Sequence, residues 1–210
     1  MKIVVGNFKN VYSKKETEKI LDDYANSFFD ENIYFCVIPD CAYFDCRFKL
    51  FAIQDQSCGR VLLGHSDFRK ALKLDNKQVL KSVVENLELG SEVLYCIGEN
   101  ETEKNKGIQK KVFKQQLKGL KKIKNKKLTI VYEPVFAIGK SEPAELSYVV
   151  SNIKIIKKFV PNVKVIYGGS VNETNAEKIL EKSEIDGVFL HRASLYKDKI
   201  SKIIKIAMNF

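Results

Sequence analysis

Residues 128 to 139 read LTIVYEPVFAIG, and the first half of this stretch decides the fold class. Apolar and β-branched residues follow one another from 128 to 132 with little polar alternation, which is typical of a strand covered on both faces in a parallel sheet. The run stops at Glu133 and Pro134. A carboxylate at the end of a buried strand is costly unless it is paired or functional, so Glu133 is the first candidate site residue.

Similar apolar runs recur along the chain and alternate with amphipathic stretches. Strands are expected at 2–7, 33–39, 49–54, 60–65, 92–98, 128–133, 164–169 and 187–191. Helices are expected at 14–28, 76–89, 107–123, 143–158, 173–182 and 196–208, the first introduced by a capping-box pattern at Ser13 and Glu16. This alternation, repeated about eight times, predicts a single α/β domain over 1–210, a (β/α)8 barrel rather than an open doubly wound sheet.

The net charge of +10 is carried almost wholly by lysine. Lysines recur at helical spacing between apolar residues in 110–127, KKVFKQQLKGLKKIKNKK, which predicts solvated helix faces and no nucleic-acid partner. The rival interpretation, a basic nucleic-acid binder, requires a contiguous lysine face with interleaved exposed aromatic residues. A net positive field also favours small anionic ligands.

The five cysteines are an odd number, and none forms a C-x-x-C pair or a zinc-like spacing with histidine. We therefore expect reduced, buried thiols, no metal and no cofactor. No apolar run approaches the roughly 18 to 20 residues of a membrane-spanning helix, and the N-terminal apolar stretch is too short for a signal peptide. The expectation is a soluble, cytoplasmic protein without a membrane partner.

In a barrel of this kind the active site lies at the carboxyl ends of the strands. The residues expected on that rim are Asn7, Lys9, His65 to Asp67, Cys96 to Glu99, Glu133, Gly168 to Ser170, His191 and Arg192. A carboxylate, an imidazole, an ammonium group and two candidate anion-binding turns suit proton abstraction beside a carbonyl in a small phosphorylated compound.

Six motifs on these segments resemble those of the triosephosphate isomerase family, in the same order. They are GNFKN (6–10), LGHSDFRK (63–70), YCIGE (95–99), YEPVFAIG (132–139), YGGSVN (167–172) and DGVFLHRASL (186–195). The resemblance implies a TIM barrel and an intramolecular aldose-ketose isomerase of glycolysis and gluconeogenesis. Its substrate would be a phosphorylated triose, interconverted between dihydroxyacetone phosphate and D-glyceraldehyde 3-phosphate through an enediol(ate).

The resemblance also implies roles for individual residues. Glu133 would be the base that moves the proton, and His65 a neutral electrophile at the substrate oxygens. Lys9 would stabilise the enediolate, Asn7 would orient a substrate oxygen, and Asp67 stands where the family has a glutamate. Residues 134 to 141 would form a lid.

The phosphate group would be bound at two turns and at the lid. Backbone N–H groups of Gly139, Ser170 and the turn at His191 and Arg192 would hold it, beside the Gly168–Gly169 pair. His191 and Arg192 stand where the family has paired glycines. The histidine would block close approach of the backbone, or else Arg192 would add a charged donor.

The largest departure from the family is a deletion between 57 and 61, where a long third loop and a helix are reduced to CGR. A parallel crossover needs about a dozen residues, so the barrel is expected to be irregular around strands three and four. The third strand would be shortened, paired as a hairpin or displaced, or 40–59 would form one long crossover.

Two further expectations follow from this deletion. The family's third loop clasps the second subunit, so the usual dimer interface is expected to be absent, leaving a monomer or an altered assembly. The alternative function is that of a weakened or inactive descendant that binds a phosphorylated metabolite or serves as a scaffold.

Overall fold

The structure is a computed structural model of the chain. It describes residues 2–8, 13–25, 32–37, 49–53, 59–123 and 127–210. Lys9 and residues 38–48 and 54–58 lie outside the described residues, so the predictions that fall there stay predictions.

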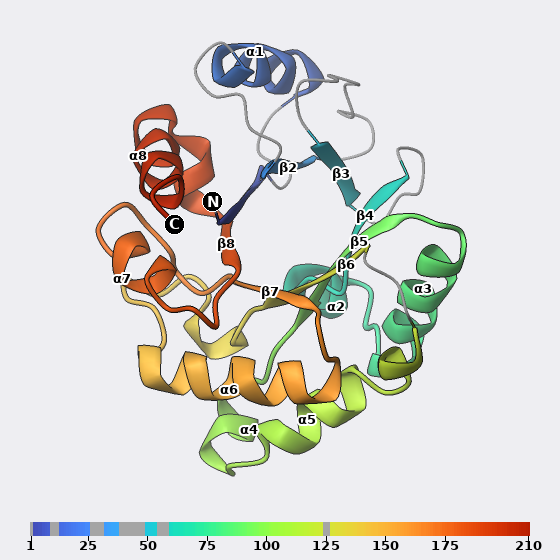
Figure 1. The fold of residues 1–210 in the computed structure, drawn as a ribbon. Coiled ribbons are helices and arrows are strands. Elements are labelled where there is room, and N and C mark those ends of the chain that lie inside the picture. Colours follow the sequence, from blue (N-terminus) through green and yellow to red (C-terminus); the bar gives the residue numbers. More distant parts are fainter. Residues whose placement is uncertain (1, 9–12, 26–31, 38–48, 54–58, 124–126) are drawn as a thin grey trace.

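Eight parallel strands close into a barrel, with β1 paired to both β2 and β8 (Figure 1). The strands are β1 Ile3–Asn7, β2 Ile33–Val37, β3 Lys49–Ile53, β4 Arg60–Leu63, β5 Glu92–Ile97, β6 Leu128–Tyr132, β7 Lys164–Tyr167 and β8 Gly187–Leu190. Every predicted strand is present, with ends that differ by one or two residues. The prediction of a TIM barrel is confirmed.

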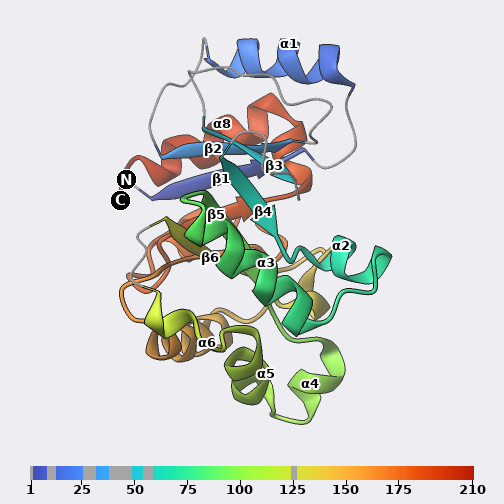
Figure 2. The same cartoon turned by 90° about the vertical axis from the view of Figure 1, so that its right-hand side faces the viewer.

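The helices lie around the outside of the strands in both views (Figures 1 and 2). They are α1 Lys14–Ala25, α2 Ser66–Ala71, α3 Asn76–Glu88, α4 Glu101–Asn105, α5 Gln109–Gln116, α6 Leu146–Phe159, α7 Ala176–Leu180 and α8 Lys197–Ala207. Short 3-10 turns are η2 Leu120–Lys122, η3 Val135–Ala137 and η4 Arg192–Leu195. The capping box before α1 is confirmed, because the Ser13 backbone N–H donates to Glu16 and the Glu16 N–H donates to Ser13.

The lysines of α5 confirm the interpretation of the lysine-rich stretch as a solvated helix face. Lys110, Lys111 and Lys114 are exposed, whereas Val112 and Phe113 on the opposite side of the helix are buried. Within the described residues, the helices are all too short or too polar to cross a membrane.

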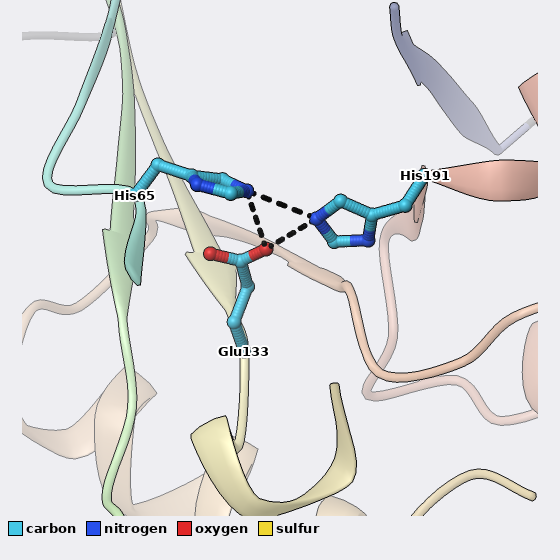
Figure 3. A group of neighbouring side chains, drawn as sticks. All are labelled: His65, Glu133 and His191. Carbon is cyan, nitrogen blue, oxygen red and sulfur yellow. Dashed lines mark hydrogen bonds and ion pairs between the residues drawn. The ribbon is translucent and has the colours of Figure 1, made fainter. Parts of the chain in front are cut away.

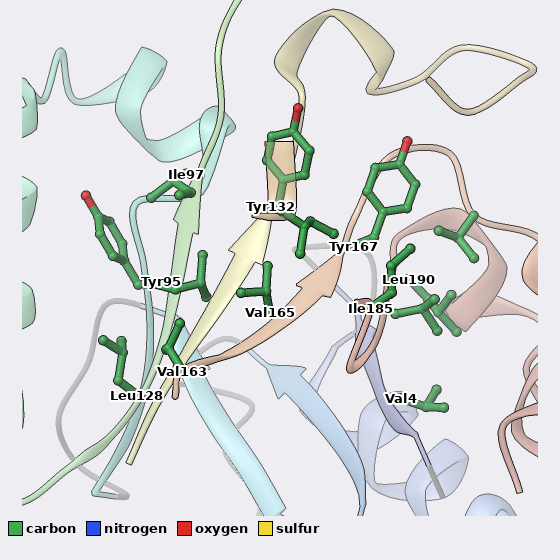
Figure 4. Packing of buried hydrophobic residues seen from close by; sticks show 14 of the residues in the cluster. Val4, Tyr95, Ile97, Leu128, Tyr132, Val163, Val165, Tyr167, Ile185 and Leu190 are labelled. Atoms are coloured by element: carbon green, nitrogen blue, oxygen red, sulfur yellow. The ribbon is translucent and has the colours of Figure 1, made fainter. Parts of the chain in front are cut away.

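Two apolar clusters hold the barrel together, one on each face of the strands. The larger cluster packs strands against helices and includes Tyr95, Tyr132, Val165 and Tyr167 (Figure 4). The smaller cluster fills the barrel and consists of Ile3, Val5, Leu62, Leu94, Cys96, Val131, Ile166 and Phe189. Strands with both faces buried explain the continuous apolar runs of the sequence.

The expected irregularity at strands three and four is present, and the register of these strands shows its form. β3 pairs in parallel with both β2 and β4, so a hairpin, a displaced strand and a single crossover over 40–59 are wrong. β3 and β4 are short and overlap only at Ala52↔Val61 and Ile53↔Leu62. The irregularity is therefore a brief, staggered overlap.

The stagger removes the geometric objection to a short connection. Because β4 begins close to the level at which β3 ends, the chain returns by about two residues, or roughly 7 Å, and steps sideways by about 4.8 Å. Six residues, 54–59, separate the two strands and reach up to about 21 Å at about 3.5 Å each. The sequence estimate was too strict because it assumed that the strands lie side by side along their full length.

The barrel interior gives a stability prediction. Leu62 is 1% exposed inside the barrel, whereas Leu89 is 71% exposed. We expect Leu62→Ala to lower the free energy of unfolding by about 2–5 kcal/mol, because the truncation leaves a cavity. Leu89→Ala is the matched control, with an expected change within about 0.5 kcal/mol. Equal midpoints of denaturant unfolding for the two variants would contradict the placement of β4 in the barrel wall.

Candidate active site

Glu133 directly follows β6, and its backbone is tied to the end of β5. Its N–H donates to the Ile97 carbonyl at 2.8 Å, and the Val135 N–H donates to the Glu99 carbonyl at 2.9 Å. A Cβ at Gly98 would lie 1.8 Å from the Glu133 carbonyl oxygen, so only glycine allows this approach. The side chain of Glu133 is 2% exposed and points into the end of the barrel.

Two imidazoles meet this carboxylate (Figure 3). Nε2 of His65, which follows β4, lies 3.6 Å from Glu133 Oε1. Nε2 of His191, which follows β8, lies 3.1 Å from the same oxygen. The two Nε2 atoms are 3.0 Å apart. Three side chains from three strand ends therefore converge on one point.

Electrostatics keep the carboxylate of Glu133 ionised. Burial opposes its charge, yet the charge of His65 and the contact with His191 outweigh burial and hold the pKa of Glu133 below its usual value. Apart from the Cys96 thiol, a weak donor, Oε2 has no hydrogen-bond partner among the described residues. A charged oxygen with free lone pairs is available to accept a proton or to bind a cation.

The ring of His65 is oriented from its other side by the start of α2. His65 is the N-cap residue of this helix, and its Nδ1 accepts a hydrogen bond from the Asp67 backbone N–H at 3.3 Å. A nitrogen that accepts cannot carry the proton, so the neutral ring carries it on Nε2. The Asp67 carboxylate is largely exposed and lies 3.7 Å from Nδ1.

A cavity of about 420 Å³ opens beside His191, which is the one of the three converging side chains that lines it. Its lining includes the predicted site residues Asn7, Gly139, Ser170, His191 and Arg192. Asn7 is buried and Arg192 is exposed. The structure thus gathers these five predicted residues at one opening, while Lys9 lies outside the described residues.

The paired glycines Gly168 and Gly169 have a packing role here and do not line the cavity. A Cβ at Gly168 would lie 3.0 Å from Cγ of Glu133, and a Cβ at Gly169 would lie 2.3 Å from the hydroxyl of Tyr167. Because glycine has no Cβ, the side chains of Glu133 and Tyr167 are able to pack directly against this backbone. Whether they also contact a phosphate stays a prediction.

The segment predicted as a lid is held by side chains of β7 and the turn after it. The Ser170 hydroxyl contacts the carbonyls of Ala137 at 2.7 Å and Lys140 at 2.9 Å, and the Ala144 N–H donates to the Tyr167 hydroxyl at 3.1 Å. Gly139 adopts φ +73°, a conformation that favours glycine. The side chain of Ser170 therefore anchors the lid, a role that the motif alone did not predict.

Sequence reasoning placed Glu99 on the rim without a role, and the structure supplies one. Glu99 is fully buried, and its Oε1 accepts from the hydroxyls of Tyr132 at 3.0 Å and Tyr148 at 2.7 Å. Asn152 donates to the Tyr132 hydroxyl at 2.8 Å. The network ties β5, β6 and α6 together beneath Glu133. The feature of the sequence that indicated this network was a glutamate just after a buried strand.

The described geometry has a chemical consequence for any substrate. The reacting group of a substrate has to lie about 3 Å from both the base and the electrophile, and Nε2 of His191 already occupies such a position, 3.1 Å from Glu133 Oε1 and 3.0 Å from His65 Nε2. His191 has φ −97°, so a side chain fits its backbone without left-handed geometry. Its imidazole, more than its backbone, is what the replacement of glycine introduces into the site.

The family model and the similar known proteins all point to the same family. A family model described as triosephosphate isomerase matches residues 47–207. Triosephosphate isomerases of Dictyoglomus turgidum and Lawsonia intracellularis are each 32% identical, over 73% and 77% of this chain and 67% and 69% of their own length. That of Aquifex aeolicus is 31% identical over 72% of the chain and 66% of its own length. The chain thus spans about two thirds of the relatives it matches.

The range of the family match separates the site residues into two groups. Residues 47–207 contain His65, Glu133 and His191. Asn7 and Lys9 precede this range, so their roles rest on the GNFKN motif alone.

The buried carboxylate of Glu99 gives a prediction of pH dependence. Burial raises its pKa above the usual value, although the hydroxyl of Tyr148 opposes the shift. The folded state therefore binds this proton more tightly than the unfolded state. Its stabilisation is complete below the unfolded pKa of about 4.3 and is lost as pH rises through the higher folded pKa.

Glu99→Gln cannot ionise, so we expect the unfolding free energy of wild type relative to this variant to fall as the pH rises above the unfolded pKa of about 4.3 and through the raised folded pKa. Denaturant titrations at several pH values measure it. Glu181→Gln, at an exposed glutamate, is the control. A difference between wild type and Glu99→Gln that does not change with pH would contradict the prediction.

Proposed function

Because the chain belongs to the triosephosphate isomerase family, we propose that it interconverts dihydroxyacetone phosphate and D-glyceraldehyde 3-phosphate. The observation that carries the proposal is the contact of a buried, ionised carboxylate, that of Glu133, with the imidazole of His65 at 3.6 Å at one end of the barrel. His191, which contacts both side chains, also lines a cavity of about 420 Å³ with Arg192 on its wall, and this cavity suits an anionic group.

The proposed reaction moves one proton between neighbouring carbons. Glu133 takes a proton from C1 of dihydroxyacetone phosphate, and the electron pair of that C–H bond forms the C1–C2 double bond of an enediolate. Nε2–H of His65 donates a hydrogen bond to the C2 oxygen and stabilises its developing charge. The proton on the C1 oxygen moves to the C2 oxygen with the help of His65. Glu133 returns its proton to C2, and the aldehyde forms at C1.

Other residues support this step in the proposal. Lys9 stabilises the enediolate by charge, and Asn7 orients a substrate oxygen. The backbone N–H groups of Gly139 and Ser170, with the side chain of Arg192, hold the phosphate in the cavity. Closure of the lid excludes water and strengthens each of these electrostatic interactions.

Turnover in this scheme requires the three side chains to separate. The carbonyl group of the substrate has to enter between Glu133 and His65, so the His191 imidazole has to leave its place. Each turnover therefore includes breaking the contacts of His191 with Glu133 and His65. This step costs free energy that a glycine at this position would not require.

The same observation favours a second candidate function, binding of a phosphorylated metabolite without turnover. The cavity beside the lid stays open while the space between base and electrophile is filled by His191. A phosphate group alone would fit such a site. Dependence of turnover on Glu133 separates the two candidates.

For the assembly, we propose a monomer or an altered oligomer. Only six residues join β3 to β4, which is too few for the long third loop that the family uses to clasp a second subunit.

A coupled isomerase assay tests the proposal. We expect Glu133→Gln to lower kcat/KM by about 10²–10⁴-fold, because the amide cannot take a proton. The matched control is Glu184→Gln, on a glutamate whose ion pair with Lys154 lies away from the site. Equal residual rates for wild type and Glu133→Gln would reject the isomerase and leave metabolite binding as the better account.

Removal of the His191 imidazole tests the separation step. In buffer with a chelator, which removes metal ions, we expect His191→Ala to raise kcat/KM roughly fivefold, the equivalent of about 1 kcal/mol net for the contacts of His191 with Glu133 and His65. The gain should vanish in the double variant with Glu133→Gln. A loss of activity in His191→Ala would show that this imidazole assists the reaction. It would contradict the proposal that the His191 ring hinders entry of the substrate.

A further inference from the structure

His65, Glu133 and His191 form a cluster of metal-ligand type (Figure 3). Each side chain offers one ligand atom, and these atoms lie within 4.8 Å of one another. The chain contains only two histidines, and both are in this cluster. Two imidazoles and one carboxylate on separate strand ends are a ligand set suited to zinc and similar divalent ions.

The distances between the ligand atoms fit one shared ion. The three separations are 3.0 Å for His65 to His191, 3.1 Å for His191 to Glu133 and 3.6 Å for His65 to Glu133. Zinc binds imidazole and carboxylate at about 2.0–2.2 Å, so two ligands at angles of about 90–120° stand about 3.0–3.6 Å apart. All three separations lie within that interval, without rearrangement of the backbone.

The burial of these side chains and the lone pairs of the Glu133 carboxylate also favour a shared metal ion. The side chains of His65 and Glu133 are each 2% exposed, and apart from the Cys96 thiol, a weak donor, no donor among the described residues reaches Oε2 of Glu133. A buried charged oxygen with so little hydrogen bonding is costly, and a cation would reduce this cost. His191 is 16% exposed and lines the cavity, which leaves room for water or an anion as a further ligand.

The side of His65 that faces away from the cluster has to change its hydrogen bond when a metal binds. A metal needs the lone pair of Nε2, so the proton moves to Nδ1, and the hydrogen bond that Nδ1 accepts from the Asp67 N–H at 3.3 Å is lost. The Asp67 carboxylate, 3.7 Å from Nδ1, becomes the acceptor for this proton once it moves closer. A carboxylate behind a ligand histidine is the usual arrangement around protein-bound metals.

We propose that His65, Glu133 and His191 bind one divalent transition-metal ion of the zinc class. The ion occupies the space between the three side chains and uses the lone pairs of the carboxylate. The site stands on geometry alone. One consequence rests on the proposed isomerase function: metal and proton transfer exclude each other, because a coordinated Glu133 cannot act as the base.

Binding is measured directly on the full chain after removal of metal by a chelator. Titration with Zn²⁺ against a chromophoric chelator is expected to give one site per chain, and Co²⁺ is expected to give visible ligand-field bands without thiolate charge-transfer bands. In protein labelled with ¹⁵N-histidine, Zn²⁺ is expected to shift the Nε2 signals of both histidines. Labelling reports on no other residue, since there are only two histidines.

Variants separate this site from the cysteines and from other carboxylates. We expect His191→Ala and Glu133→Gln to weaken Zn²⁺ binding by at least about a hundredfold, the upper end of what loss of an outer partner costs. Glu173→Gln, a carboxylate at the edge of the same cavity paired with Lys199, is the matched control and should bind as wild type does. Zn²⁺ should raise the Tm of wild type and not that of His191→Ala, which also shows that the variant folds.

The outcomes are distinguishable from those of the isomerase assay. Absence of Zn²⁺ binding, unchanged affinity in His191→Ala, or thiolate bands with Co²⁺ would each overturn the metal site, whatever the turnover. Turnover is measured with the metal removed, so its absence rejects the isomerase and leaves the metal site standing. If both hold, added Zn²⁺ should inhibit wild type and spare His191→Ala; equal inhibition of the two would overturn the exclusion between metal and base.

Discussion

The arrangement of the site depends on one buried charge, the carboxylate of Glu133. It lies at the end of β6, 2% exposed, where a lone carboxylate would be unstable. The two imidazoles that contact it come from the ends of β4 and β8, which are distant in sequence. Closure of the parallel barrel brings those three strand ends to one rim. The contacts that stabilise the buried carboxylate therefore depend on closure of the sheet.

Much of the fold was legible in the sequence because strands buried on both faces leave continuous apolar runs. All eight strands were predicted within two residues, and Glu133 and His65 were both placed on the rim where the structure brings them together. The deletion before β4 was located correctly, but its consequence was overestimated. Sequence gives the length of a connection and not the register of the strands that it joins, and here a stagger of β3 against β4 makes a short connection sufficient.

The role of His191 was less predictable. Sequence comparison with the family's glycines directed attention to its backbone and to approach of a phosphate. The structure places its ring 3.0 Å from His65 and 3.1 Å from Glu133, a result of side-chain direction at the end of β8 that no local pattern encodes. In the two proposals, the same side chain would hinder entry of a substrate and would complete a set of metal ligands. The lone pairs of Glu133 would then serve either proton transfer or metal binding, but not both at once.

The central claim is that substrate and the His191 ring compete for one space between Glu133 and His65. It is tested most directly by NMR of the metal-free chain with a phosphorylated hydroxamate that mimics the planar enediolate. The account predicts that ring-proton contacts between the two histidines disappear when this compound binds, while His65 signals shift. Binding of the compound with the contacts between the two rings intact would contradict it.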